Sequence, residues 1–503
     1  MNWKKYLPGI GLFFLALLVR IPWLWEVPRY IDELREVNLG YLIYKGAVFP
    51  LHNVSGEIGA LHNYILAGIF QVFGANIYWP RLYVAITSAC TVLLVYFLGK
   101  RLYNHWTGII AAGLLLTNGM HILVTHMAWA NCTTPFFFTL ALIAIVKAEE
   151  EKNGKWLVAS GFFWALTLQT HSSVIVYIPA VLLYILILRF GEFKKIPFRY
   201  HVYGVIVFIA GYANMIIFNI ISRGESIRWI STKGYTLESN PGLVSFGNNL
   251  SGMWFQLIRT LSSTYANQES LWSYFIYPFF SIAAFLLGFG IYRSIKEKKT
   301  LLLLIIAGGF LVIPWINHRY EFFVVTRYIM PVIIAALIIM AYGISVLLTK
   351  FLQSENKLKY GLGVLFLVVI GMQLVPFYSY CSRLAETNLS NTLSLRLVNT
   401  VKQVNQSKAM VLVDPEIKIT NNPIPTLLRI CSIDSRKILS LERHNFKRKD
   451  IEPGYAILTP ATFQSLERKI GLKKLKVFER KSLIPNSKPD SIQPVYLVKI
   501  TSW

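Results

Sequence analysis

The segment RLYVAITSACTVLLVYFLGKR, Arg81–Arg101, is an apolar run with cations at both ends. A helix needs about 20 predominantly apolar residues to cross a bilayer core. Similar runs recur along the chain, and the full set lies at about 7–25, 81–99, 107–126, 131–147, 156–171, 173–189, 202–221, 273–292, 300–316, 328–349 and 361–378. The sequence therefore predicts an α-helical polytopic membrane protein with about eleven transmembrane helices.

The composition agrees with this class. Of 503 residues, 54% are hydrophobic and 15% are charged, whereas soluble domains carry about 25% charged residues. The formal net charge is +25. We assign this excess to topology, because the cytoplasmic loops of membrane proteins collect Lys and Arg. No basic motif is interleaved with stacking aromatic residues, so nucleic acid is excluded as a partner.

The basic residues also predict the orientation. Lys4 and Lys5 place the N-terminus in the cytoplasm, and the first run has no small-residue cleavage site after it, so we expect an uncleaved first helix. Alternation puts five short basic loops on that same side, as the positive-inside rule requires. These loops are Lys100/Arg101, Lys147–Lys155, Arg189–His201, Arg293–Lys299 and Lys350–Lys359.

The loops 26–80, 222–272 and 317–326 then lie outside. Apolar residues 63–79 would reverse every later loop if they crossed the membrane. The segment is short and contains Gln71 and Asn76, so we predict a helix that lies on the outer membrane surface. An odd number of crossings leaves the tail outside.

The tail differs in character from the rest of the chain. It has β-like runs at Met410–Val413, Tyr455–Leu458 and Val495–Ile500, and a helical stretch at Thr462–Gly471. We therefore predict two domains, a transmembrane domain over 1–378 and a small extracytoplasmic α/β domain over 379–503. Cys381 and Cys431 could pair in an oxidising compartment, but the sequence leaves this open.

The first outer loop carries the candidate catalytic residues. It contains the sequence EVPRYIDELREVNLGYLIYKGAVFPLHNVSGEIGALHNYIL, Glu26–Leu66. Asp32 and Glu33 follow the first predicted helix closely, and a carboxylate held beside cations at a membrane surface can act as a general base. Ordinary solvated loop charges fit these residues equally well. Further polar residues of the loop are Glu36, His52, Glu57 and His62.

Several segments in order resemble the GT-C glycosyltransferases, which include protein O-mannosyltransferases and lipid A aminoarabinose transferases. The acidic pair in the first outer loop is one such feature. The others are WPRLYVAITSACTVLLVYFLGKRLY (Trp79–Tyr103), HMAWANCTTPFFFTLAL (His126–Leu142), LQTHSSVIVYIPAVLL (Leu168–Leu183) and TRYIMPVI (Thr326–Ile333). The resemblance covers about residues 1–350. It implies a GT-C fold and a polyprenyl-phosphate sugar as the donor.

The resemblance also implies residue roles. Asp32 matches the family's catalytic base or acceptor-orienting carboxylate, Glu33 is its partner, and Arg327 with Tyr328 matches the position that faces the donor phosphate. The chain departs from the family at Glu57–Asn63, where the aminoarabinose transferases have a Lys-Pro-Pro turn. It also has Asn131 where many relatives have Asp.

The chemistry of such a transfer requires cations as well as a base. Displacement at an anomeric carbon needs positive charge near the leaving phosphate, and Arg makes bidentate phosphate contacts. Some of these residues have a plainer explanation. Arg81 and Arg327 could snorkel at helix ends, and His318 and Arg319 could be solvated loop residues. His171 could be a structural histidine whose hydrogen bonds are satisfied. The substrate-binding candidates are Glu57, His62, Arg81, His171, His318, Arg319, Arg327 and Tyr328.

A divalent metal ion is compatible with the sequence but is not required by it. Asp32, Glu33 and Glu57 could ligate such an ion through oxygen, yet no spacing of ligands fixes a site.

We therefore predict an inverting glycosyltransferase that moves a sugar from a polyprenyl-phosphate donor to a lipid, glycan or protein acceptor. The reaction would take place at the outer face of the plasma membrane. The alternative is a lipid or glycan transporter or flippase without transferase activity. A transferase would place Asp32 and Arg327 around one cavity at the outer membrane face, whereas a transporter would place its polar groups near the bilayer midplane.

Overall fold

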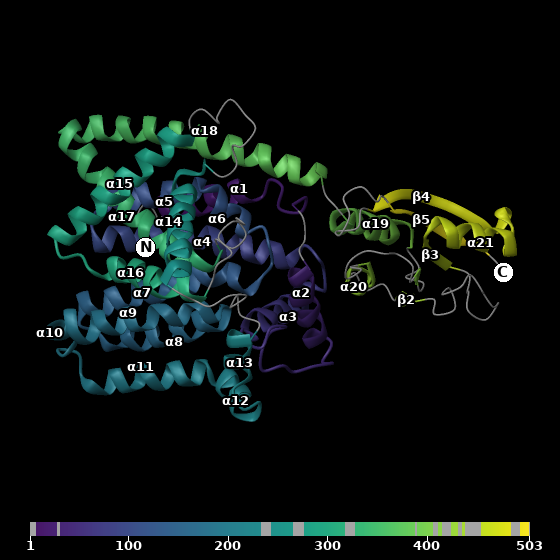
Figure 1. The fold of residues 1–503 in the computed structure, drawn as a ribbon, viewed down its shortest axis with the longest axis horizontal. Helices are drawn as coiled ribbons and strands as arrows, with labels where there is room; N and C mark the ends of the chain where they lie inside the picture. The colour runs from purple at the N-terminus through teal and green to yellow at the C-terminus, as the bar shows by residue number, and fades with distance from the viewer. Residues whose placement is uncertain are drawn as a thin grey trace. The chain divides into compact units, whose positions relative to one another are not determined.

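The computed structural model describes residues 7–27, 31–232, 243–264, 276–316, 327–387, 390–405, 411–414, 424–430, 435–437, 454–483 and 493–501. The chain divides into two compact units (Figure 1). The first, called here the helical unit, comprises Met1–Leu24, Phe49–His62 and Arg81–Tyr380. The second, called the mixed unit, comprises Trp25–Val48, Asn63–Pro80 and Cys381–Trp503. The predicted division at 378/379 stays a prediction, and parts of the first loop group with the C-terminal residues.

The helical unit is built from helices of very different length. Its elements are α1 (Leu7–Arg20), α4 (Trp79–Leu102), α5 (His105–Thr117), α6 (Gly119–Val124), η2 (Ala130–Thr133), α7 (Thr134–Glu151), α8 (Gly154–Thr170), η3 (Ser172–Tyr177), α9 (Ile178–Leu183), the π-helical turn η4 (Tyr184–Leu188), α10 (Phe190–Phe193), α11 (Phe198–Gly211), α12 (Ala213–Ile221), α13 (Glu225–Thr232), α14 (Leu243–Ser262), α15 (Ile276–Lys296), α16 (Leu301–Ile316), α17 (Met330–Leu352) and most of α18 (Glu355–Thr387).

Among the described residues, five helices are long and apolar enough to span a membrane, and a pair bent by 58° at the α11–α12 junction would make six. The other predicted spans coincide with shorter or interrupted helices. The predicted span 107–126, for example, is broken at Asn118, whose side chain accepts a hydrogen bond from the His121 backbone and caps α6. The unit is thus that of a multi-pass membrane protein, as predicted.

The buried centre of the helical unit is α17. Every residue from Met330 to Ser345 is buried, and a helix that is apolar all round must be surrounded by other helices. It packs against α5 and α15, and at Gly290 of α15 an added Cβ would lie 2.1 Å from the Ile339 carbonyl oxygen. Glycine is therefore what allows α15 and α17 to approach this closely.

Several basic loops that the sequence assigns to one side of the membrane gather at one end of the helical unit, called here the basic end. Arg101 forms an ion pair with Glu150, and Lys152 forms one with Glu192. Tyr103 stacks on a tyrosine of α17 with ring centroids 4.2 Å apart. Loops 100–104, 147–155 and 189–195 therefore share one end, in agreement with the predicted alternation.

Helix α14 is a feature that the sequence analysis did not predict. It lies in the predicted outer loop 222–272 and packs against α15 and α16. The Asn118 side chain donates to the Thr260 carbonyl at 2.7 Å, and the Asn249 side chain donates to the Pro314 carbonyl at 2.9 Å. Asn118 follows the end of α5, and Pro314 lies in the last turn of α16. Both of these helix ends are opposite the basic end, so α14 lies at that opposite end.

The mixed unit contains a helical hairpin and a sheet. Its helices are α2 (Ile31–Tyr44), nearly all of α3 (Leu61–Phe73), α19 (Ser390–Val404), α20 (Ile424–Ile430) and α21 (Pro460–Ile470). At 13 residues, or about 20 Å at 1.5 Å per residue, α3 is too short to cross a core about 30 Å thick. Helix α5, in a predicted span, is equally short, so the location of residues 63–79 on the membrane surface stays a prediction.

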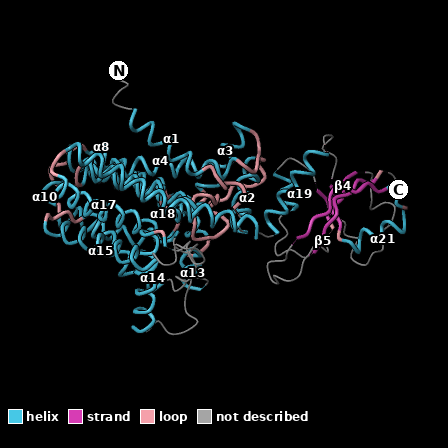
Figure 2. The backbone as a smooth tube through the Cα atoms, turned by 90° about the horizontal axis from the view of Figure 1, so that it is seen from above, coloured by secondary structure: helices cyan, strands magenta, loops and turns pink. Residues whose placement is uncertain are grey.

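The sheet has strands β1 (Val411–Val413), β2 (Ser435–Lys437), β3 (Gly454–Leu458), β4 (Leu475–Leu483) and β5 (Gln493–Ile500) in the order β2-β1-β3-β5-β4. The β1 strand pairs in parallel with β2 and β3, and β5 pairs antiparallel with β3 and β4. Figure 2 shows helices beside the strands, and α21 packs its Phe463 and Leu466 onto the sheet. The predicted α/β fold of the tail is confirmed.

Candidate functional site

Four side chains meet at the end of the helical unit opposite the basic end. We call Trp129, His171, Arg327 and Tyr328 the aromatic–cation cluster. The Arg327 guanidinium carbon lies 4.2 Å from the Trp129 ring centroid and 4.6 Å from the Tyr328 ring centroid. Its Nη2 donates to the Tyr328 hydroxyl at 2.7 Å, and the Tyr328 ring lies 4.8 Å from the His171 ring. The Arg327 side chain is thus held in place by two rings and a hydroxyl.

Helix ends supply the members of this cluster. His171 follows α8 in an extended conformation, and its Nδ1 accepts from the Ser173 backbone at 3.1 Å, which caps η3. Trp129 is likewise extended and precedes η2. Arg327 and Tyr328 open the turn that leads into α17. Trp129 and His171 are buried, whereas Arg327 and Tyr328 are half-buried, so the arginine side of the cluster is the part that a ligand can reach.

Part of the first predicted outer loop returns into the helical unit beside this cluster. The Gly59 backbone donates to the Gln169 carbonyl at 3.0 Å. The Asn214 side chain donates to the Leu51 carbonyl at 2.6 Å and to Gln169 Oε1 at 3.1 Å, and Ser226 Oγ donates to the Gly56 carbonyl at 2.6 Å. These hydrogen bonds fix loop 49–62 against Gln169, which precedes His171 by two positions in the sequence.

The fit at Gly59 leaves no space for a side chain. A Cβ there would lie 2.4 Å from Gln169 Oε1 and 3.0 Å from the Gln169 Cα. Glu57 is half-buried within the same loop. His62 is buried, and its Nε2 lies 3.1 Å from the Ala128 carbonyl, next to Trp129. The structure thus brings His62, His171, Arg327 and Tyr328 into one region, with Glu57 in the loop that borders it.

Arg81 lies at the same end of the helical unit, at the start of α4, where the ring of Tyr83 packs 5.8 Å from the ring of His62. It is fully buried in the first turn of α4, and its Nη1 donates to the Leu24 carbonyl at 2.8 Å. Snorkelling at a helix end, the alternative for this residue, would have left the guanidinium exposed.

The first acidic pair belongs to the mixed unit, and its two members face differently. Asp32 is exposed, whereas Glu33 is fully buried. Glu33, Glu36 and Gly40 follow the helical spacing of one face, and that face packs on α3, where an added Cβ at Gly40 would lie 2.9 Å from the Leu66 Cβ. The Glu36 carbonyl accepts from Asn63 at 2.9 Å. Asp32 is thus the member of the pair that is open to solvent.

His318 and Arg319 lie outside the described residues, and their place in the site stays a prediction. Within the described ranges, no group of three or more His, Cys, Asp or Glu side chains is arranged to hold a metal ion. The suggestion that Asp32 ligates a metal also stays a prediction.

The sequence analysis missed a second buried group at this end. The fully buried Arg20 donates from Nε to Ser88 Oγ at 2.5 Å, and its Nη2 lies 3.0 Å from His121 Nδ1. His126 Nε2 lies 2.8 Å from the Arg20 carbonyl. The sequence feature that could have revealed this group is an arginine and two histidines in or at the ends of apolar runs, where ionisable residues are often functional. Trp129 and Gln169 were also missed as site residues, because their roles depend on partners remote in sequence.

Comparison with known proteins identifies the fold. Residues 59–217 match the family model described as dolichyl-phosphate-mannose-protein mannosyltransferase, and no curated protein matches the chain. ArnT from Cupriavidus metallidurans, solved bound to undecaprenyl phosphate, is similar with a TM-score of 0.60 and 12% identity, over 99% of this chain and 98% of that one. The Archaeoglobus fulgidus oligosaccharyltransferase in its apo form is similar with a TM-score of 0.51 and 11% identity, over 95% of this chain and 74% of that one. The predicted resemblance is confirmed, and the chain has the GT-C fold.

Proposed function

We propose that this chain, a membrane protein with the GT-C fold, is an inverting glycosyltransferase that takes its sugar from a polyprenyl-phosphate donor. The observation that carries the proposal is the aromatic–cation cluster. It holds an arginine at the end of the helical unit where a lipid-linked phosphate would sit if that end faces the outer surface. The undecaprenyl phosphate of the similar ArnT structure supports this class of donor.

The proposed step forms one bond and breaks one. The acceptor hydroxyl attacks the anomeric carbon of the sugar, and the bond from that carbon to the phosphate oxygen breaks, so that polyprenyl phosphate leaves and the configuration inverts. Arg327 would neutralise the charge that grows on the leaving phosphate, because its planar group offers several donors in a fixed geometry. His62, Arg81, His171 and Tyr328 would line the sugar and phosphate sites.

The acceptor proton would pass to the Asp32 carboxylate. An exposed carboxylate at the start of a helix can reach an incoming hydroxyl, whereas the buried Glu33 is better placed to orient its neighbour. Glu57 would contact the sugar or the acceptor from loop 49–62. His318 and Arg319 are proposed to add cations near the phosphate.

The location of the reaction is part of the proposal. The gathering of the basic loops supports a cytoplasmic basic end, since cytoplasmic loops are enriched in Lys and Arg. The opposite end, with the aromatic–cation cluster, and residues 379–503 would then lie outside the cytoplasm, with the plasma membrane as the site of action.

A transfer assay with the Asp32→Asn variant tests the proposal. The protein would be reconstituted in vesicles with radiolabelled polyprenyl-phosphate sugars and an extract of cell-envelope lipids and glycans as acceptor. We expect the rate to fall by about 100-fold or more, as for the loss of a general base, with donor binding retained. Glu297→Gln removes a carboxylate at the basic end and serves as the control, with wild-type rate expected.

Two results would contradict the proposal. Near wild-type transfer by Asp32→Asn would show that Asp32 is an ordinary loop charge. Failure of the wild-type protein to release polyprenyl phosphate from any donor in the panel would refute the transferase function itself.

A further inference from the structure

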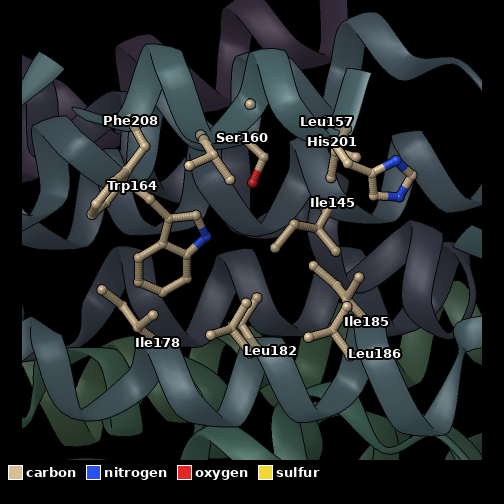
Figure 3. A pocket seen from close by; sticks show the side chains of 14 residues that line it. Ile145, Leu157, Ser160, Trp164, Ile178, Leu182, Ile185, Leu186, His201 and Phe208 are labelled. Carbon is tan, nitrogen blue, oxygen red and sulfur yellow. The ribbon is translucent and has the colours of Figure 1, made fainter. Parts of the chain in front are cut away.

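An apolar slot lies within the helical unit, and none of its lining residues belongs to the aromatic–cation cluster. Figure 3 shows Ile178, Leu182 and Leu186 on one side of the slot, with Trp164 and Phe208 toward one end. Its volume is about 420 Å³, and it is formed by α7, α8, α9, η4 and α11. Nearly all of its lining atoms are apolar, so water inside it would find few hydrogen-bonding partners.

The slot runs along the helices and opens to the periphery of the unit. On α8 its walls extend from Leu157 to Trp164, a rise of about 10 Å at 1.5 Å per residue. Three of the lining side chains are strongly exposed, which shows that one side of the slot is open: Val205 at 58%, Leu186 at 55% and Leu182 at 47%. In a membrane this opening faces lipid chains, and an elongated apolar occupant fits it.

One end of the slot lies at the basic end. His201 lines this end and sits in the first turn of α11, where the connection from α10 enters. Glu192 in α10 is engaged by Lys152 and Lys195, whose hydrogen bonds lower the pKa of the carboxyl to about 2.

Two exposed cations are left available on either side of this connection, Lys194 at the end of α10 and Arg199 in the first turn of α11. Lys194 and Arg199 make no ion pair within the described part of the chain, although Arg199 lies 5.2 Å from the Tyr200 ring centroid. His201, which lines the basic end of the slot, lies two residues after Arg199 and seven after Lys194 in the sequence. An apolar slot with two cations close to one end in sequence suits a phospholipid with a negative head group.

We propose that the slot binds one acyl chain of an anionic phospholipid from the leaflet at the basic end. The chain lies between α8, α9 and α11 and reaches Trp164, and Lys194 and Arg199 hold the head-group phosphate. Basic segments beside helices attract anionic lipid head groups, and an acyl chain that fills the slot restores packing contacts that an empty cavity lacks. The lipid binds whether or not the chain transfers sugar.

Tryptophan quenching tests the proposal directly. Trp164 is 6% exposed and lines the deep end of the slot, so a bromine carried midway along an acyl chain reaches it only if the chain enters. The full-length protein and its Trp164→Phe variant would be placed in nanodiscs of brominated phosphatidylglycerol. The difference between their quenching isolates the signal of Trp164. We expect clear Trp164-dependent quenching, reduced at least twofold in brominated phosphatidylcholine.

A matched pair of variants on α11 blocks or spares the slot. Val205→Phe fills the slot from its open side, whereas Ile206→Phe adds the same side chain at a site that is 54% exposed and does not line it. We expect Val205→Phe to reduce the Trp164-dependent quenching by half or more and Ile206→Phe to leave it unchanged. The double variant Lys194→Gln, Arg199→Gln should remove the preference for the anionic lipid without abolishing quenching.

Several outcomes would overturn the proposal. Equal quenching in Val205→Phe and Ile206→Phe would mean that the signal comes from the surrounding bilayer. Equal quenching by the two head groups in the wild-type protein would refute the role of the cations. Displacement of the brominated lipid by polyprenyl phosphate would assign the slot to that lipid instead.

Discussion

Arg327 allows the proposed donor site to be tested quantitatively. The change is Arg327→Gln, which removes the charge but keeps a polar side chain. In the structure the guanidinium carbon lies 4.2 Å from the Trp129 ring centroid, and Nη2 donates to the Tyr328 hydroxyl at 2.7 Å. A charged hydrogen bond to a phosphate is worth about 1.5–3 kcal/mol, and each 1.4 kcal/mol corresponds to about a tenfold change in affinity. Arg327→Gln should therefore raise the donor KM by roughly 10- to 100-fold.

The contacts inside the cluster predict a smaller effect on folding. A cation–π contact contributes about 0.5–2 kcal/mol, so the thermal midpoint of Arg327→Gln should fall by only a few degrees. Arg327→Lys keeps the charge but loses the planar fork, and its donor KM should lie between the wild-type and Gln values. Tyr328→Phe removes only the hydroxyl and should raise the donor KM less than Arg327→Gln.

The assay is donor titration with purified, reconstituted protein, together with thermal unfolding of each variant. Arg293→Gln is the matched control, since it removes an arginine that is paired with Glu297 at the basic end. If Arg327→Gln loses stability but keeps the wild-type donor KM per folded molecule, the guanidinium only packs the helix end. The phosphate role proposed for it is then wrong.

Four further predictions concern stability, mechanism and topology. Gly59→Ala should lower the free energy of unfolding by about 1–3 kcal/mol, as overpacking against backbone does; an unchanged melting curve would contradict the tight loop anchor. Ser88→Ala should cost about 1–3 kcal/mol because it leaves a buried donor unsatisfied, and Ser88→Thr, which keeps the hydroxyl, should be closer to wild type. Glu33→Gln should slow transfer less than Asp32→Asn, and the reverse order in the assay would make Glu33 the base. A cysteine at Arg101, in a variant without native cysteines, should resist membrane-impermeant reagents in intact cells; rapid labelling would invert the proposed topology.

The sequence predicted the helical architecture because the apolar runs are long and the loops between them are basic. It missed α14 because Asn248, Asn249 and Arg259 dilute its apolar character, although Met253, Leu257 and Ile258 are buried in the structure. Burial of one face against α15 and α16 overrides that local signal. In the tail, β4 was missed because its sequence LKVFERKSL is mostly polar. Pairing with β5 stabilises this strand despite its weak intrinsic preference for the β conformation.

The candidate site was predictable where chemistry lies in one short motif. Arg327 and Tyr328 are neighbours in sequence and proved to be in contact. Their contacts with Trp129 and His171 could not be predicted, since they join segments about 200 and 160 residues apart in a fold that was not yet known. Asp32 is exposed and Glu33 is buried because residues one position apart point about 100° apart on a helix. Which of the two is buried depends on where α3 packs, and the sequence did not predict that.

The described core also bears on the transporter alternative. A transporter binds its cargo near the bilayer midplane with polar groups on broken helices. In the central helix α17, the run from Met330 to Ala341 is apolar and buried throughout. The buried Arg20 is engaged by Ser88, His121 and main-chain carbonyls, which is the pattern of a satisfied structural arginine. In the described helices around α17, ionisable side chains thus concentrate at the two ends of the unit. That distribution favours chemistry at a membrane surface over passage through the centre.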